Sequence, residues 1–165
     1  MREALEAFAV EKAIENLTSD AADHLRDKIN LYGQDVQNRF SREHLVFDQE
    51  VHLAVAQIAG NETLKNLLNH LFERIVLKRR TDGLYDPSRG TAAHQEHLQL
   101  LAAIERRDTA EAVTLVRSHI QAGERNVMTD LKQRQAIRDF RPVELTNLQQ
   151  KNIKERENYG SRSSY

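Results

Sequence analysis

Residues 47–61 read FDQEVHLAVAQIAGN, and this stretch indicates the fold class. Its apolar residues recur at spacings of three and four, the period of an α-helix that buries one face. Asp48 and His52 lie four positions apart, so both side chains point toward the same side of that helix. That side is an apolar stripe, which consists of Leu45, Val55, Ala56 and Ala59. The stretch therefore predicts a core helix that carries a carboxylate and an imidazole into the interior.

The same helical spacing continues along most of the chain, and no segment shows the alternation of a half-buried strand. We expect helices at about residues 2–16, 20–40, 42–60, 62–82, 91–106 and 109–140. The first would present one side formed by Leu5, Phe8, Ala9, Lys12 and Ala13. The fold class that follows is an all-α antiparallel bundle of about six, or seven, helices with short connections.

Short polar residues and glycines mark the ends of these helices. Thr18, Ser19 and Asp20 offer N-caps for the second helix, and Ser41 offers one for the third. Gly60 suits a left-handed C′ position and Asn61 can cap the next helix, so this pair indicates punctuation first and a ligand contact second. Asp86-Pro87-Ser88 indicates a turn in a loop of residues 84–90. Asp108 and Glu111 form a capping-box-like start of the sixth helix, and Pro142 marks either the end of that helix or the first turn of a new one.

One domain accounts for most of the chain. A length of 165 residues suffices for a single hydrophobic core. We expect that domain at residues 1–140. Residues 141–165 are polar and poor in apolar side chains, so we expect a frayed helix or a disordered tail there.

The composition excludes several classes of protein. The chain has no cysteine, so it holds no disulfide, thiolate zinc site or cysteine nucleophile. No apolar run approaches the roughly 20 residues of a membrane span and no signal peptide opens the chain, so we expect a cytoplasmic protein without a membrane partner. The formal net charge is −1, and the basic run Lys78-Arg79-Arg80 closes a helix, where cations suit the helix dipole. A domain that binds nucleic acid by itself usually carries a basic excess.

Two further histidines interrupt apolar stripes as Asp48 and His52 do. His97 shares a helix face with Ala93, Leu100, Leu101 and Ile104. His119 shares one with Ala112, Leu115, Val116 and Gly123. Because each helix of a bundle buries its apolar face, these four ionisable groups on three helices converge on one interior.

Two kinds of interior would accept such groups. Burying an unpaired carboxylate or imidazole is costly, so buried groups of this kind are paired or bind a metal. One Asp and three neutral His supply the N and O ligands of a divalent transition metal in a bundle core. The spacing allows a metal-free Asp–His hydrogen-bond network equally well. His44, one turn before Asp48, and His94, one turn before His97, could replace one of the four or hold it in place.

Four segments together resemble the FCD domain, the C-terminal effector-binding domain of FadR-type regulators in the GntR family. FDQEVHLAVAQIAGN is similar to that family's D-x-x-x-H…GN signature, and REALEAFAVEKAIEN to its opening R-x-x-LE…A helix. AHQEHLQLLAAIERRD is similar to the EH-x-x-(I/L)-x-x-A(I/L)-x-x-(G/R)D helix, and AEAVTLVRSHI to the closing A-x-x-x-(M/V)-x-x-H(I/L) stretch. The four motifs keep the family's order and spacing, and the resemblance covers about residues 1–135.

The resemblance implies a metal site and a ligand at that site. In metal-containing members, the ligands match Asp48, His52, His97 and His119. The family's ion keeps positions open for the carboxylate of a small organic acid, and the arginine of the opening helix faces the same cavity, which matches Arg2. A guanidinium binds a carboxylate as a bidentate fork. The GN of the signature makes Asn61 a further candidate contact. Zinc is the first expectation for the metal, with nickel, manganese and iron as alternatives.

The expected function is therefore a sensor of a small carboxylate that works as a homodimer. FadR-type regulators read DNA through a winged helix-turn-helix domain of some 70 residues, and we expect no such domain within this chain, so DNA is a partner only through a missing N-terminal domain. One alternative is a metal-dependent hydrolase or lyase that uses the same ligands, but no further Glu or Asp on the neighbouring stripes suggests a general base. The other is a structural bundle with a metal-free polar core. We expect a protein that is not an enzyme.

Overall fold

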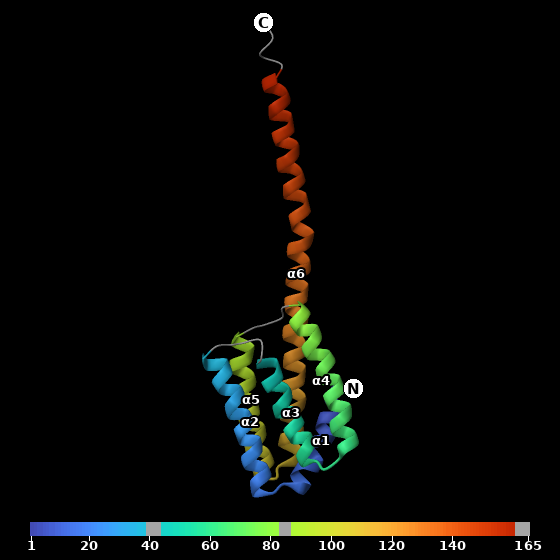
Figure 1. Cartoon of the computed structure of the whole chain (residues 1–165), viewed down its shortest axis with the longest axis vertical. Helices are drawn as coiled ribbons and strands as arrows, with labels where there is room; N and C mark the ends of the chain where they lie inside the picture. The colour runs from blue at the N-terminus through green and yellow to red at the C-terminus, as the bar shows by residue number, and fades with distance from the viewer. Residues whose placement is uncertain (39–43, 83–86, 161–165) are drawn as a thin grey trace. The chain divides into compact units, whose positions relative to one another are not determined.

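The computed structural model describes residues 1–38, 44–82 and 87–160 of the chain. Within these residues all regular structure is helical, in the six helices that Figure 1 shows. They are α1 (Arg2–Asn16), α2 (Ser19–Asn38), α3 (His44–Ile58), α4 (Glu62–Asp82), α5 (Pro87–Glu105) and α6 (Thr109–Gly160). The expected all-α class is confirmed.

The chain divides into two units, Met1–Asn126 and Val127–Tyr165. The first unit contains α1 to α5 and the beginning of α6, and it holds the core. The second unit is helical up to Gly160, and its described side chains are largely exposed. This division falls after Asn126. The domain boundary expected at residue 140 remains a prediction.

The core of the first unit surrounds α3. This helix packs against α1, α2 and α4, and α2 also packs against α5. Its buried apolar residues join two clusters, one shared with α1, α2, α5 and α6 and a smaller one shared with α1 and α4. Each large apolar side chain buried in this way contributes about 1.5–3 kcal/mol. A polar residue on the buried face of α3 is thus placed near the middle of the unit.

The turn between α3 and α4 is built as its sequence predicts. Gly60 has a φ of +68°, the left-handed conformation that glycine adopts without a Cβ penalty. The Oδ1 atom of Asn61 accepts a hydrogen bond of 3.0 Å from the backbone N of Leu64, the N-cap bond of α4. Asn61 is exposed in this position. Gly60 and Asn61 therefore end one helix and begin the next.

The link between α5 and α6 also follows its sequence. The Asp108 side chain accepts a hydrogen bond of 3.0 Å from the backbone N of Glu111, as the capping box predicts. Arg107 before it has a φ of +58°, the only positive φ of a non-glycine residue among those described. Its guanidinium donates to the carbonyl oxygens of Ile14 and Leu17, so it holds the end of α5 against the end of α1.

Two expected helix boundaries were wrong. α5 begins at Pro87 rather than at about residue 91, because proline lacks the N–H that the first helical turn leaves unpaired and its fixed φ suits that position. α6 continues past Phe140 and Pro142 to Gly160 rather than ending at about residue 140. The expected frayed or disordered tail at residues 141–165 remains a prediction. A proline inside a helix, such as Pro142, costs about 3 kcal/mol. The Leu, Gln, Lys, Glu and Arg residues in the sequence around it are good helix formers, which offsets part of this cost.

The buried side of α1 is also turned from the one expected. Ala9 and Ala13 are buried, but Phe8 is 42% exposed and Lys12 is only partly buried. Glu6 lies on the buried side, with a relative exposure of 3%. The caps expected at Ser41 and the turn residue Asp86 lie outside the described residues.

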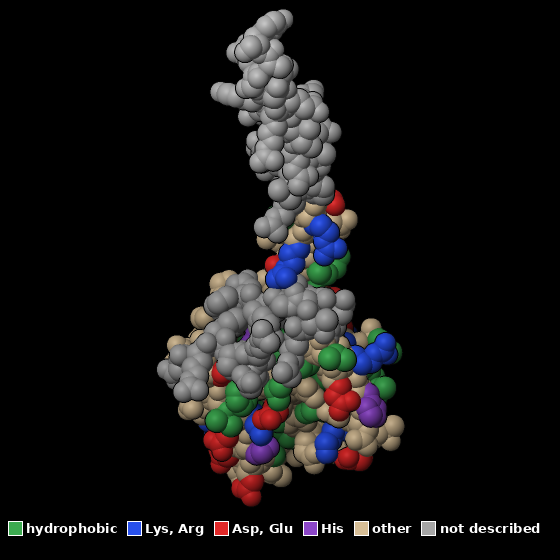
Figure 2. All heavy atoms as spheres, turned by 45° about the horizontal axis from the view of Figure 1, so that its top comes forward, with side chains coloured by type: hydrophobic (Ala, Val, Ile, Leu, Met, Phe, Trp, Pro, Cys, Tyr) green, Lys and Arg blue, Asp and Glu red, His purple; other side chains and the backbone are tan. Residues whose placement is uncertain are grey.

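The described surface has no single charge character on the face that Figure 2 shows. Among the coloured side chains of the described residues, acidic, basic and apolar groups are interspersed on this face. Among the helices of the described residues, none combines the length and apolar character that a membrane span needs.

Candidate metal centre

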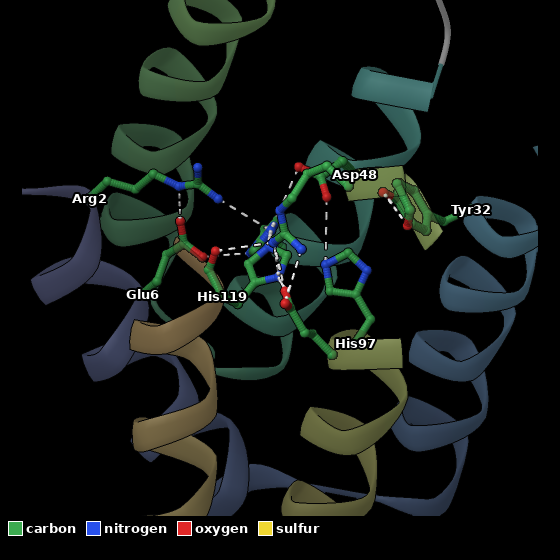
Figure 3. Close-up of polar contacts among 10 residues, drawn as sticks. Arg2, Glu6, Tyr32, Asp48, His97 and His119 are labelled. Atoms are coloured by element: carbon green, nitrogen blue, oxygen red, sulfur yellow. Dashed lines mark hydrogen bonds and ion pairs between the residues drawn. The ribbon is translucent and has the colours of Figure 1, made fainter. Parts of the chain in front are cut away.

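The structure brings Asp48, His52, His97 and His119 together inside the first unit. One ligand atom from each lies within 4.8 Å of every other. α3 supplies Asp48 and His52, while α5 supplies His97 and α6 supplies His119 (Figure 3). The three histidines are between 1% and 7% exposed. The convergence predicted from the apolar stripes is thus present in the fold.

His52 is held from behind by a carboxylate of α1. Its Nδ1 atom lies 2.6 Å from Oε2 of Glu6, and the other carboxylate oxygen of Glu6 is paired with Arg2. The Nη2 atom of Arg2 lies 3.2 Å from Nε2 of His52. Because a guanidinium only donates hydrogen bonds, Nε2 of His52 is the acceptor and Nδ1 carries the proton. Glu6 therefore fixes this imidazole with its bare Nε2 toward the other ligands.

His119 is held in the same way by a carboxylate of α5. Its Nδ1 atom lies 2.7 Å from Oε2 of Glu96. Arg89 binds Glu96 in a bidentate pair, with distances of 3.0 and 2.6 Å, and also donates to the backbone carbonyl of His119. Arg89 is 3.4 Å from Nδ1 of His119 as well, but the shorter carboxylate contact assigns the proton to Nδ1. Each of the two histidines thus ends an Arg–Glu–His chain.

The two Arg–Glu–His chains meet at their Nε2 atoms. Nε2 of His52 and Nε2 of His119 are 3.1 Å apart. Both atoms bear a lone pair when Nδ1 holds the proton, so they cannot hydrogen-bond to each other. Oδ2 of Asp48, a further acceptor, is 3.9 Å from Nε2 of His52. Acceptors that face one another at such distances need a shared proton or a cation between them.

His97 completes the group with an unsatisfied side chain. Neither of its ring nitrogens has a hydrogen-bond partner among the described residues. Nε2 faces Oδ1 of Asp48 at 3.6 Å, beyond hydrogen-bonding distance, and the ring packs edge-on against Tyr32. A buried nitrogen without a partner costs about 1–3 kcal/mol, so the site is incomplete as it stands.

The electrostatics of the group favour charged carboxylates at Asp48 and Glu6 and neutral imidazoles at His97 and His119. Burial raises the pKa of Asp48, but the adjacent histidines and Arg2 outweigh it and hold that pKa well below its usual range. Burial likewise opposes the lowering of the pKa of Glu6, which His52 and Arg2 nevertheless bring to about 2. Burial lowers the pKa of His97 and that of His119. Neutral imidazoles and an ionised carboxylate are the protonation states that bind a metal ion.

The donor set fits a divalent transition metal. Ligand atoms on opposite sides of an ion are about 4.2 Å apart when each metal–ligand bond is about 2.1 Å. The greatest separation here is 4.8 Å, so a small inward movement of side chains suffices. Histidines whose Nδ1 donates to a carboxylate are the usual form of metal-binding histidine. This group could therefore hold an ion.

A small pocket opens beside the group. Its volume is about 40 Å³, and Arg2, Asp48, Arg89 and His119 contribute polar walls. Arg2 is held there by Glu6 and by the ring of Phe72, with 4.6 Å between the guanidinium carbon and the ring centroid. The position expected for Arg2, facing the cavity, is thus the one it has.

Three further candidates fall in different places. His44 lines the same pocket, next to Tyr32. His94 also lies near Tyr32, and its ring occupies the space that a side chain at Gly33 would need. Asn61 caps α4 and is not among the residues that line the pocket. The structure does not bring His94 or Asn61 to the four ligands.

Sequence reasoning missed Glu6, Glu96 and Arg89. Glu6 lies three and four residues before Ala9 and Val10 on the buried side of α1. A search for ionisable residues on buried helix faces, which found Asp48, would also have found Glu6 if the buried face of α1 had been predicted correctly. Glu96 directly precedes His97. The sequence analysis considered acidic residues only as general bases and so overlooked these two carboxylates behind the ligands. Each of the two carboxylates binds an arginine and a histidine, so they orient the site.

Comparison with known proteins gives the family. The family model of the FCD domain matches residues 1–122. The chain belongs to the FCD domain family. No curated protein sequence matched it.

Two solved structures share the fold of this FCD domain. "Streptococcus agalactiae GntR" superposes with a TM-score of 0.65 at 22% identity, over 75% of this chain and 55% of that one. "E. coli McbR/YncC" superposes with a TM-score of 0.66 at 19% identity, over 80% of this chain and 65% of that one. The chain thus spans about 55–65% of the length of these relatives. With the family match, the helical bundle of residues 1–122 is an FCD domain.

Proposed function

We propose that this FCD domain senses a small organic acid at a divalent metal ion held by Asp48, His52, His97 and His119. The observation that carries the proposal is the pair of Nε2 atoms of His52 and His119, 3.1 Å apart with both protons directed to carboxylates. A metal-free hydrogen-bond network would place a donor opposite an acceptor. Here acceptor faces acceptor, as ligands around an ion do.

Zinc is the first choice for the ion, because three imidazoles and one carboxylate are typical zinc ligands. Nickel, manganese and iron bind the same donors, and availability decides among them. Bound there, the ion supplies a Lewis-acid position for an anionic oxygen of the ligand. Glu6 and Glu96 keep His52 and His119 in the tautomer that binds it.

The pocket would receive the carboxylate. Arg2 lines it with a guanidinium that can bind two carboxylate oxygens at once. Because Arg2 belongs to α1 and the ligands belong to α3, α5 and α6, an acid bound between them would contact four helices. Such a contact can favour one packing of the bundle over another.

The signal would pass to a DNA-binding domain elsewhere in a longer protein. The two similar structures are named as a GntR protein and as McbR/YncC, and the chain covers only part of each. We propose a cytoplasmic homodimer in which the bundle changes the spacing of two DNA-reading domains, and so their affinity for an operator.

Metal content is the direct test. The protein is purified without a nickel-affinity tag, incubated with zinc, desalted and measured by mass spectrometry for metal per chain. We expect about one ion per chain in the wild type and none in His97→Ala. His70→Ala is the matched control, because the His70 side chain is 75% exposed and should leave the metal in place. A wild type that holds no metal after incubation would contradict the proposal.

A further inference from the structure

Five charged side chains surround the pocket in the described part of the chain. Arg2, Asp48 and Arg89 line it directly. Glu6 and Glu96 stand behind the two arginines and bind them as ion pairs. The charge on any ligand that this pocket accepts must balance these groups, because ions buried without a partner are costly.

The count depends on the metal. The two guanidinium groups and three carboxylates around the pocket carry a net charge of −1. A divalent ion at the four ligands brings that net charge to +1. The metal-free pocket therefore repels an anion, and the loaded pocket attracts one.

The hydrogen bond between Arg2 and His52 points to the same order of events. Nε2 of His52 accepts from Nη2 of Arg2 at 3.2 Å. That lone pair cannot also bind an ion. Metal binding therefore releases a donor of Arg2 at the wall of the pocket, where it is available to a carboxylate.

The volume of the pocket limits the size of the ligand. A site needs about 10–15 Å³ for one water molecule, so about 40 Å³ accommodates about three groups of that size. A carboxylate with one or two further carbons fits this space. A sugar acid would need the pocket to widen.

We infer that the effector is a small carboxylic acid with a single negative charge, and that it binds only after the metal. The inference rests on the proposed function and specifies its ligand. One charge neutralises the loaded pocket, whereas a dicarboxylate would leave an uncompensated negative charge. By thermodynamic linkage, the acid must raise the affinity of the domain for the metal by the same factor as the metal raises the affinity for the acid.

The first experiment compares L-lactate with malonate, two three-carbon acids that carry one and two charges. Their dissociation constants are measured by titration calorimetry at pH 8, on zinc-loaded and on metal-free protein, with zinc content checked after each titration. We expect lactate to bind the loaded protein at least tenfold more tightly than malonate, and neither to bind metal-free protein. Equal or tighter binding of malonate, binding of lactate without zinc, or no binding of either acid to the loaded protein would overturn the inference.

The second experiment uses two variants of the Arg89–Glu96 ion pair that change the net charge of the pocket in opposite directions. Arg89→Gln removes one positive charge, and Glu96→Gln removes one negative charge. If the pair acts only through structure, both changes weaken lactate and malonate alike. On our inference, Arg89→Gln weakens lactate by about tenfold, and Glu96→Gln shifts the ratio of the two constants toward malonate by a similar factor. Glu62→Gln is the control, because Glu62 is exposed and pairs only with Lys65 among the described contacts.

The two proposals fail in different ways. Protein that cannot be loaded with zinc contradicts the proposed function itself. Protein that binds zinc but prefers malonate leaves the metal sensor standing and refutes the single-charge ligand.

Discussion

Replacing Glu6 with glutamine tests whether a buried carboxylate organises the site. The folded protein holds the pKa of Glu6 at about 2, against 4.5 for an unperturbed glutamate, and its side chain is 4% exposed. A difference of about 2.5 pKa units corresponds to about 3 kcal/mol of stability at neutral pH. Glutamine keeps the size and an acceptor oxygen for His52 but loses the charge that binds Arg2. We expect Glu6→Gln to lower the free energy of unfolding by about 3 kcal/mol.

The assay is urea denaturation of the metal-free protein, followed by circular dichroism at several pH values. In a parallel thermal denaturation, a loss of about 3 kcal/mol should lower the Tm by roughly 6–12 °C for a chain of this length. Because the pKa of Glu6 is lower in the folded state, its contribution is complete above pH 4.5 and declines as the pH falls toward 2. The gap between wild type and Glu6→Gln should therefore be constant from pH 6 to 8 and narrow in acid.

The matched control is Glu15→Gln in the same helix. Glu15 is exposed and pairs with Lys12, so its loss should cost little. If Glu6→Gln were no less stable than Glu15→Gln, or if its deficit did not change with acid pH, the role assigned to the Glu6 charge would be refuted.

Three more outcomes are expected. His97→Leu should abolish zinc binding. In urea denaturation with a chelator, the same change should stabilise the metal-free protein by about 1–2 kcal/mol, because leucine removes two buried nitrogens that lack hydrogen-bond partners. A loss of stability would show that these nitrogens are not unsatisfied in the folded protein. Burial lowers the pKa of His97 and of His119, so these histidines take up protons at a higher pH in the unfolded chain than in the folded one. The Tm of metal-free protein should therefore fall as the pH drops through 6.5. A Tm that rises or stays level over this range would contradict this reasoning. Gly60→Ala should cost about 1 kcal/mol in the same denaturation assay, because φ at that position is +68°, and no cost would show that the turn can relax.

The four candidate ligands could be predicted from the sequence because they depend on helical periodicity alone. Asp48 and His52 lie on the stripe that α3 must bury, and His97 and His119 lie on those of α5 and α6. Once a chain of this length forms one core, such residues meet in its interior whatever the details of the loops.

The supporting residues could not be predicted in this way, because their positions depend on where a helix begins and on which of its sides is buried. Phe8 suggested a buried side for α1 that the structure exposes, and this displaced Glu6 from consideration. Arg89 was assigned to a loop because the start of α5 at Pro87 was not foreseen. The phase and the first turn of a helix are settled by packing against its neighbours rather than by its own composition.

The four ligands join helices that are distant along the chain, and this has a consequence for how the bundle opens. A metal bound to α3, α5 and α6 would act as a crosslink that closes the long loop between His52 and His119. Helices tied in this way cannot fray one at a time. Amide hydrogen exchange in α3, α5 and α6 should then slow to a common rate, while α2 and α4, which supply no ligand, keep rates of their own. The ion would decide which parts of the domain unfold together, and the set of motions available to the sensor would change with it.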